Sequence, residues 1–492
     1  MMRRPAAVLA AAVLCLLLAA CGSQLDPGTV ARATGSTGGG TGDPGVGGTV
    51  AGGGTGGGTT GGGSLGSGTG GGSTGGTGGT TTTGGGTATG GGSTSGGDAP
   101  QGTGANAAAG SAKAASCAGF KNQTGITDKT ITIANVADVS GPVPGIFESA
   151  QQATRAYAAY FNSTSSICGR KLEVELLDSR ADAGADQQAY TKACDDAFAA
   201  VGSMGAFDSG GAQAAQSCGL PDIRSTTTTP ERRDCTTCFA AQAVDPGLVN
   251  GSMPRYFYSK LKDATQHAAV LYINAGAAAV NAQMFKNAYP KAGWKVDYFQ
   301  GIDVSEFNYA PYVQQMKDKG IRLVTYTGPY QDTVKLLDAM QQQGFEPDAF
   351  VQDATIYDQN FVDQAGDNGN GVYTWSTTKM FDDTSIKEMA LYRSWLQQVK
   401  PGAVPNYYGL YAWSAARLFV EQAVALGGRL TRASLVDAVS KVKDWTGNGL
   451  HVPQQVGAKT TSTCGSVLQL NDGTWRQVSP GGYMCGPLLS GK

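Results

Sequence analysis

The distribution of hydrophobic and polar residues predicts a strand, a turn and a helix as the first structured unit of the chain. Residues 131–136 alternate with the period of two that a strand requires. Ser140-Gly141-Pro142 ends the strand, and Phe147 begins an apolar helix face that reaches residue 161. A strand that leads into a helix through small residues presents free backbone N–H groups at its carboxyl end, where ligands bind in open α/β sheets.

This unit repeats downstream in two series, which predicts an α/β protein with two lobes, each a parallel sheet flanked by helices. In the first series we expect strands at 171–177, at 198–205 and just before the polar loop that begins at 225, and helices at 182–197, 212–217 and 248–261. In the second we expect strands at 268–273, 295–298, 321–326 and 349–351, and helices at 277–288, 309–319 and 333–343.

The last part of the chain departs from this alternation. Residues 371–375 have the pattern of a segment that crosses back to the first lobe. Three helices are predicted after it, at 386–399, 408–426 and 432–442. Two short apolar segments around Asn471-Asp472-Gly473 then predict a β-hairpin at 467–478.

The N-terminal residues indicate export. Arg3 and Arg4 precede an apolar run at 6–20 that is too short to cross a bilayer comfortably, so residues 1–20 are interpreted as a signal peptide. Leu18-Ala19-Ala20-Cys21-Gly22 resembles the lipobox of bacterial lipoproteins, which implies cleavage before Cys21 and a lipid on its thiol. The alternative is an ordinary signal peptide with an incidental cysteine.

Composition separates the residues that follow from the rest of the chain. Most of the 74 glycines precede residue 105, and residues 21–114 (the lipidated Cys21 and a Gly/Thr/Ser-rich segment) have too little apolar surface to fold, so we expect a disordered tether. Residues 115–492 have ordinary globular composition and exceed the usual size of one hydrophobic core. The net charge of -2, with 36 basic and 38 acidic residues, gives no indication of nucleic-acid binding.

The cysteines also indicate an exported protein. Without Cys15 and Cys21, eight of the ten remain, an even number typical of disulfide-bonded chains, although eight cysteines allow 105 pairings. By proximity in the sequence we favour Cys117–Cys168, Cys194–Cys218, Cys235–Cys238 and Cys464–Cys485. The Cys235-x-x-Cys238 pair could instead be redox-active or bind zinc, but no second ligand pair completes a zinc site, so a structural disulfide is expected.

Four segments carry a family resemblance: 140–147, 225–231, 327–330 and 407–416. In their order and spacing the globular part resembles a type I periplasmic substrate-binding protein, of the branched-chain amino-acid-binding kind that serves ABC importers. The resemblance implies two lobes joined by three crossings, with lobe 1 at about 115–245 and 373–443 and lobe 2 at about 246–372 and 444–492. It further implies a monomer outside the cytoplasm, anchored by its N-terminal lipid, that gives a small polar ligand (an amino acid, an amide or similar) to a permease. No cofactor or metal is expected.

Candidate ligand-binding residues come from the positions of the strand ends and from the family resemblance. Ser140 and Phe207-Asp208-Ser209 follow strands, where N–H and hydroxyl groups pair the charges of a buried ligand. The resemblance adds Phe147 in the first loop, Thr226, Thr227 and Thr228 in the second, and Tyr330 as an aromatic cover from lobe 2. The chain departs from the family where the amino-acid binders place an acid that pairs with an ammonium group, since it has Gln352-Asp353-Ala354 there. Asp353 is the candidate for that role, and Asp208 is an additional acid in lobe 1. The alternative for each of these residues is an ordinary turn or capping role.

An enzyme is not predicted. Asp208-Ser209-Gly210-Gly211 resembles part of the trypsin-like serine motif, but that fold needs a histidine upstream, and His267 and His451 both lie downstream. Two other functions remain open besides transport. The same two lobes could serve as a ligand sensor coupled to a signalling partner, or as a tethered domain with a structural role.

Overall fold

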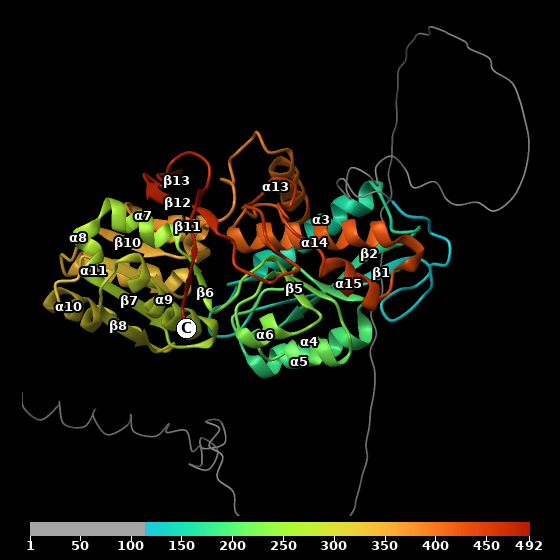
Figure 1. Ribbon diagram of the computed structural model, residues 1–492, viewed down its shortest axis with the longest axis horizontal. Helices are drawn as coiled ribbons and strands as arrows, with labels where there is room; N and C mark the ends of the chain where they lie inside the picture. The colour runs from blue at the N-terminus through green and yellow to red at the C-terminus, as the bar shows by residue number, and fades with distance from the viewer. Residues whose placement is uncertain (1–113) are drawn as a thin grey trace, which may run out of the picture. The chain divides into compact units, whose positions relative to one another are not determined.

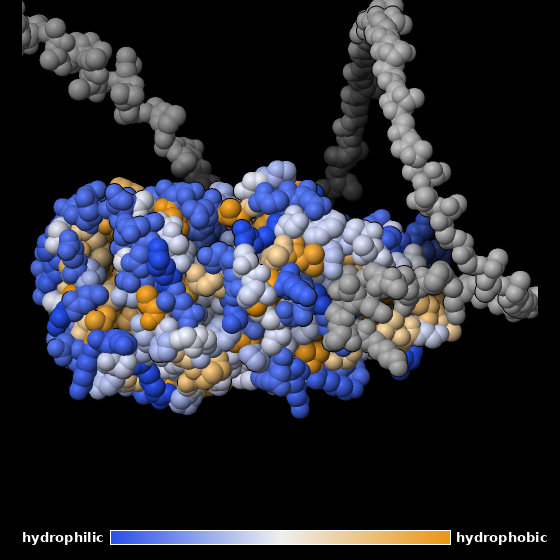
Figure 2. Space-filling view, turned by 90° about the horizontal axis from the view of Figure 1, so that it is seen from above, coloured by the Kyte–Doolittle hydropathy of each residue, from blue (hydrophilic) through white to orange (hydrophobic). Residues whose placement is uncertain are grey.

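The computed structural model describes residues 114–492. The expected signal peptide, the expected lipidation site Cys21 and nearly all of the expected tether therefore lie outside the described residues. Within residues 114–492, no helix is both long enough and apolar enough to cross a membrane. On the face seen in Figure 2, hydrophobic residues are scattered in small groups among hydrophilic ones.

The first lobe is built on a five-stranded sheet in the order β2-β1-β3-β4-β5, and every pairing in it is parallel. The alternation in β1 separates two cores: Ile131 and Ile133 pack on one side of the sheet, and Ala134 and Val136 pack on the other. The strands are β1 (Thr130–Ala137), β2 (Lys171–Asp178), β3 (Ala199–Val201), β4 (Asp222–Thr226) and β5 (Cys238–Gln242).

Helices cover both faces of this sheet (Figure 1). The long helix α14 is buried on nearly all sides and packs with α3 against the first core. The opposite face is covered by shorter helices that contribute Tyr190 and several alanines to the second core. The helices of the first lobe are α3 (Glu148–Thr164), α4 (Ala183–Asp196), α5 (Ala212–Ser217), α6 (Pro230–Asp234), α13 (Lys387–Val399), α14 (Tyr407–Leu426), η4 (Gly427–Arg429) and α15 (Arg432–Val439).

The second lobe contains a larger, mixed sheet in the order β13-β12-β11-β10-β9-β7-β8, with β14 paired to β12. Strands β7 to β11 are parallel, and β12, β13 and β14 add to them in antiparallel pairs. The strands of this lobe are β6 (Leu248–Asn250), β7 (Ala268–Ile273), β8 (Val296–Ile302), β9 (Leu323–Thr327), β10 (Ala349–Gln352), β11 (Tyr373–Ser376), β12 (Cys464–Asn471), β13 (Thr474–Gln477), β14 (Met484–Cys485) and β15 (Leu488–Ser490).

Helices again form two cores, one on each face of the sheet. Ala269 and Leu271 of β7 pack with α10 to α12, and Ala268 and Val270 of the same strand pack with α7 to α9. The helices are α7 (Ser252–Lys260), α8 (Lys262–Thr265), α9 (Gly276–Ala288), η1 (Tyr289–Ala292), α10 (Ala310–Asp318), α11 (Tyr330–Gln342), η2 (Ala354–Ile356), α12 (Gln359–Ala365) and η3 (Gly366–Gly369).

The structure confirms two lobes joined by three crossings and corrects where the crossings lie. The segment expected to return to lobe 1 at 373 is strand β11, which pairs with β10, so the crossing begins only after Ser376. The segment expected to enter lobe 2 at 444 packs Leu450 and Val456 into the first core of lobe 1, and lobe 2 resumes at β12. The predicted helix 248–261 is also wrong at its start, because β6 pairs with the C-terminal strand β15.

All four disulfides have the pairing favoured from the sequence: Cys117–Cys168, Cys194–Cys218, Cys235–Cys238 and Cys464–Cys485. The last of these joins residues that face each other in the β12–β14 pair. Cross-links of this kind limit the conformations of the unfolded chain and so stabilise the folded one.

Candidate functional site

A cavity of about 870 Å³, including the part open to solvent, lies at the carboxyl ends of the strands in both lobes. Lobe 1 contributes the loop between β1 and α3, the loop that follows β3, and the first turn of α14. Lobe 2 contributes the loops that follow β7, β9 and β10. The lining residues are Asp138, Pro142, Val143, Ile146, Phe147, Ala181, Met204, Ala206, Phe207, Thr228, Ile273, Ala275, Ala277, Ala278, Asn281, Val304, Thr327, Gly328, Pro329, Asp353, Thr355 and Tyr408.

Most of this wall is apolar or aromatic. Phe147, directly before α3, lies edge-on to Tyr408, with ring centroids 5.1 Å apart. The Tyr408 hydroxyl is 3.2 Å from the Thr355 hydroxyl of lobe 2, so this pair also connects the two lobes. An apolar cavity with few polar groups is typical of small-molecule sites, because the polar groups fix the orientation of the ligand.

Two carboxylates lie in this apolar wall. The Asp138 side chain accepts hydrogen bonds from Ser179 Oγ (2.6 Å) and from the backbone N–H of Ala206 (2.7 Å), and burial raises its pKa. Asp353 accepts one from the backbone N–H of Thr355 (2.9 Å), and burial raises its pKa too. Within residues 114–492 no lysine, arginine or histidine lines the cavity, so Asp138 and Asp353 have no cationic side chain beside them in its wall. The cavity therefore favours a ligand with a cationic or hydrogen-bond-donating group.

The lobes meet at one corner of the cavity. The backbone N–H of Ala277, in the first turn of α9, donates a hydrogen bond of 2.9 Å to the carbonyl of Ala206 in lobe 1. Gly276 has a φ of +50°, and a Cβ at this position would lie 2.7 Å from that carbonyl oxygen and 3.1 Å from the Phe207 ring. A residue without a side chain is thus needed where the two lobes touch.

Four of the predicted ligand-binding residues line the cavity: Phe147, Phe207, Thr228 and Asp353. The polar atoms of Thr228 are used within its own lobe, because its hydroxyl donates to the Gly205 carbonyl (2.9 Å) and its N–H donates to Asp208 (3.0 Å). Thr228 therefore shapes the wall in this structure, whereas Asp353 has no ion-pair partner among residues 114–492.

The other predicted residues lie away from the cavity. The Ser140 N–H and hydroxyl both donate to Asp178. Tyr330 begins α11 and packs against the core of lobe 2 that contains α10 to α12. Of the remaining four, Asp208 is fully buried and Ser209 lies in the turn before α5. Thr226 is the last residue of β4, and Thr227 is buried in the loop that follows.

Several lining residues were missed. Asp138 carries a signal that could have been used, since it is an acid directly after an apolar strand at the sheet edge where ligands bind. Asn281 lies inside α9 and Tyr408 inside α14, and only the packing of the helices places them at the cavity.

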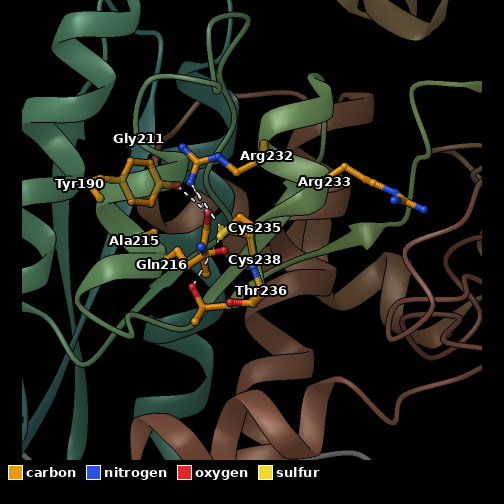
Figure 3. The surroundings of a disulfide bond; sticks show 12 residues. Tyr190, Gly211, Ala215, Gln216, Arg232, Arg233, Cys235, Thr236 and Cys238 are labelled. Carbon is orange, nitrogen blue, oxygen red and sulfur yellow. Dashed lines mark hydrogen bonds and ion pairs between the residues drawn. A yellow bond between two sulfur atoms is a disulfide. The ribbon is translucent and has the colours of Figure 1, made fainter.

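A group of buried charges surrounds Arg232 in lobe 1. The guanidinium of Arg232 donates to Asp186 (2.9 Å), to Asp222 (2.9 Å) and to the Asp208 carbonyl (2.7 Å). It also lies 3.8 Å from the sulfur of Cys238. Figure 3 shows the Arg232 side chain directed toward Tyr190 and that of Arg233 directed away. Burial raises the pKa of Asp186 to about 6.

The structure also locates the cysteine pair, the histidine and the serine motif that the sequence raised as possible redox, metal-binding or catalytic groups. Cys235 and Cys238 form a buried disulfide between α6 and β5. His267 lies in lobe 2, 3.1 Å from Asp297, whereas the Asp208-Ser209 turn belongs to lobe 1. Within the part of the chain that the structure describes, no group of three or more His, Cys, Asp or Glu side chains is arranged to hold a metal ion.

Comparison with known proteins agrees with this architecture. The Leu/Ile/Val-binding protein homolog 1 of Brucella abortus is 23% identical over 300 residues, which cover 59% of this chain and 76% of that protein.

Solved structures share the fold. The branched-chain amino acid substrate-binding protein LivJ of Streptococcus pneumoniae, in complex with isoleucine, matches with a TM-score of 0.61 and 17% identity, over 72% of this chain and all of that one. A solute-binding protein from R. palustris in complex with 4-hydroxybenzoate matches with a TM-score of 0.60 and 16% identity, over 71% and 96% of the two chains. A profile of the family described as "Periplasmic binding protein" matches residues 130–474, and the chain therefore belongs to the periplasmic binding protein family.

Proposed function

We propose that the protein is an extracytoplasmic solute-binding lipoprotein that captures a small amine-bearing ligand, such as an amino acid, between its lobes and gives it to an ABC importer. The observation that carries the proposal is Asp353, a carboxylate in an apolar interlobe cavity with no cation beside it in the described residues. A ligand ammonium group would supply the missing partner. Membership of a family of transport-associated binding proteins supports the role, and the isoleucine in complex with the similar protein LivJ supports an amine.

The two lobes suggest the binding mechanism. The ligand would first contact one lobe in an open state, and its contacts with the other lobe would then stabilise the closed state. Asp353 belongs to lobe 2 and the rings of Phe147 and Tyr408 to lobe 1, so a bound ligand would contact both. We further propose that Cys21 carries the lipid that holds the protein at the membrane, for which mass spectrometry of the mature protein is the test.

The test compares two acids of lobe 2. Binding of amino acids, simple amines and their uncharged amide analogues is screened by thermal shift and measured by titration calorimetry. Asp353→Asn should weaken binding of the amine-bearing ligands by about 1.5–3 kcal/mol, about ten- to a hundredfold, because it removes a charged hydrogen-bond partner. The control Asp367→Asn changes an exposed acid outside the cavity and should have no effect.

Two results would count against the proposal. If no amine-bearing compound binds the wild-type protein, the ligand class is wrong. If an amine binds and both variants keep its affinity, the position of its ammonium group is wrong.

A further inference from the structure

A second cavity of about 830 Å³ lies next to the first and shares three residues with it: Asn281, Thr327 and Asp353. We call the cavity described above the front compartment and this one the rear compartment. The rear compartment extends toward β6 and α7 of lobe 2 and toward the first crossing, which contributes Val244. We call these three residues, which belong to the walls of both compartments, the waist.

The rear compartment is suited to apolar groups. Its wall contains Met253, Met284, Phe285, Tyr289 and Trp375, and among the described residues that line it only Asp353 is charged. Methionine and aromatic side chains adapt to varied apolar shapes.

The amides in this wall are mostly occupied within the protein. Asn250 Nδ2 donates to the Ser462 carbonyl (2.7 Å), and Gln352 Nε2 donates to the Gly328 carbonyl (2.8 Å). A polar ligand group would therefore find few free partners in the rear compartment.

The waist, in contrast, has unused polar groups. The Asp353 carboxylate accepts hydrogen bonds only from Thr355, within its own lobe, and has no cation beside it in residues 114–492. The side chain of Asn281 has no hydrogen-bond partner within the same residues and lines both compartments. A donor group at the middle of a ligand would satisfy the carboxylate and the amide oxygen together.

We propose that the ligand is an elongated amine whose nitrogen lies at the waist between Asp353 and Asn281, with one apolar group in each compartment. This inference rests on the proposed function and adds the shape of the ligand to it. Because Asp353 and Asn281 belong to the walls of both cavities, a ligand whose nitrogen pairs with them can extend into each compartment. A polyamine fits poorly, because its outer cations would lie beyond Asp353, in the part of the rear compartment that has no charged residue in its described wall.

The test uses two secondary amines that differ only in the length of one chain, N-methylbenzylamine and N-hexylbenzylamine. Each methylene group that is buried in an apolar site improves affinity by up to about fourfold. Because the longer amine adds several methylene groups, we expect it to bind at least about tenfold more tightly, even after the cost of ordering its chain. Titration calorimetry on the wild-type protein gives this ratio without any variant.

Two variants locate the added chain. Val244→Trp narrows the rear compartment and should bring the affinity ratio close to one. Val404→Trp changes an exposed residue that lines neither compartment and should leave the ratio unchanged. Circular dichroism and a melting curve establish that each variant is folded.

The outcomes separate the two proposals. A wild-type ratio near one overturns the elongated shape, and so does binding of free amino acids with neither probe bound, although the proposed function then stands. A ratio that Val244→Trp leaves unchanged in the folded protein places the chain outside the rear compartment and also overturns the inference. Failure of every amine and amino acid to bind overturns the proposed function itself.

Discussion

At the scale of single residues, the main feature of lobe 1 is how it pairs buried charges. Arg224 and Arg232 are fully buried, and both contact Asp222. Arg224 also lies 3.6 Å from Asp208, whose side chain accepts hydrogen bonds from Thr228 and Thr229. The charges therefore hold the loop that forms one wall of the front compartment. Replacing one member leaves the others buried without a partner, which is costly.

Arg232 and its neighbour Arg233 provide a matched test of this point. Arg232→Leu should lower the free energy of unfolding by about 3–5 kcal/mol, because Asp186 and Asp222 lose a buried partner. Arg233→Leu removes a partly exposed arginine and should cost no more than about 1 kcal/mol. Urea unfolding of the two variants gives the difference. Equal losses would contradict the importance assigned to the buried network.

His451 is a buried residue whose hydrogen bonds define its protonation state. Its Nδ1 lies 2.9 Å from the Val452 carbonyl and must donate to it, so Nε2 accepts from the Ser414 hydroxyl at 2.8 Å. The ring also stacks on Tyr411. Burial lowers the pKa of His451 from 6.5 to about 4, so the folded protein keeps this side chain neutral under weakly acidic conditions.

We expect His451 to destabilise the protein as the pH falls. Between about pH 6.5 and pH 4 the unfolded chain binds a proton that the folded protein does not bind, so stability is complete above this range and decreases through it. The loss by pH 4 should be roughly 3 kcal/mol. Urea unfolding at several pH values should show a smaller acid-dependent loss in His451→Leu than in the wild type. Identical pH profiles would contradict the assignment.

The chain has two histidines, which makes an independent measurement straightforward. NMR of the imidazole signals, assigned with His267→Gln, should show that the His451 signal keeps the neutral shift near neutral pH and titrates with a midpoint near pH 4. A transition near pH 6.5 for that signal would show that the ring is not buried as described.

Four of the ten ligand-binding residues predicted from the sequence line the cavity, and the reason is physical. Phe147, Phe207, Thr228 and Asp353 all follow strands, and strand ends of a parallel sheet meet at one edge. Ser140 and Asp208 have the same kind of position, but local hydrogen bonds turn their side chains toward Asp178 and Thr229. The period of the hydrophobic residues and the position after a strand predict where the backbone lies. The direction of a side chain depends on partners that are distant in the sequence.

At the scale of elements, patterns of period two and 3.6 were sufficient for the long segments. The hairpin followed from Asn471-Asp472-Gly473, and the positive φ of Asp472 (48°) and Gly473 (69°) is what a two-residue turn between β12 and β13 requires. Helix 386–399 was predicted within one residue of α13.

Short strands were not predictable in the same way. β5 directly follows the Cys235–Cys238 disulfide, and its five residues have no pattern that separates them from a loop. β6 has three residues and pairs with β15, which lies more than 200 residues later in the chain. β11 lacks a helix after it and so resembles a crossing, although Val351 and Gln352 of β10 pair with it. Strands of this length are specified by their partners and carry too few residues to show a period.

At the scale of the whole described domain, hydrogen bonds and close approaches join the two lobes. The Ala277–Ala206 hydrogen bond joins the lobes at one corner of the front compartment, where a Cβ on Gly276 would lie 3.1 Å from the Phe207 ring. Asn406 Nδ2, at the start of α14, donates to Asp358 of lobe 2 (2.8 Å). Because these contacts join the two lobes, a small change at one of them should shift the balance between open and closed states without unfolding either lobe.

Gly276 provides the sharpest test of this dependence. Gly276→Ala would place a methyl group 2.7 Å from the Ala206 carbonyl oxygen, so the closed state should be disfavoured. Affinity for the best amine of the binding screen should fall about tenfold or more, since ligand-bound protein is closed protein. Small-angle X-ray scattering should show less compaction on addition of that amine than in the wild type.

A substitution at a second glycine, Gly320, separates the effect of lobe closure on affinity from the effect of backbone strain on stability. Gly320 has a φ of +63°, close to the +50° of Gly276, but a Cβ at Gly320 would meet nothing within 4 Å. Gly320→Ala therefore carries a similar conformational cost of about 1–2 kcal/mol without any contact between lobes, and should lower stability while leaving affinity unchanged. If the two variants bind equally well and compact to the same extent, the contact at Gly276 does not limit closure. If Gly276→Ala alone binds weakly, the corner formed by Ala206, Phe207 and Gly276 sets how far the lobes approach, and the need for close approach explains why α9 begins with a glycine.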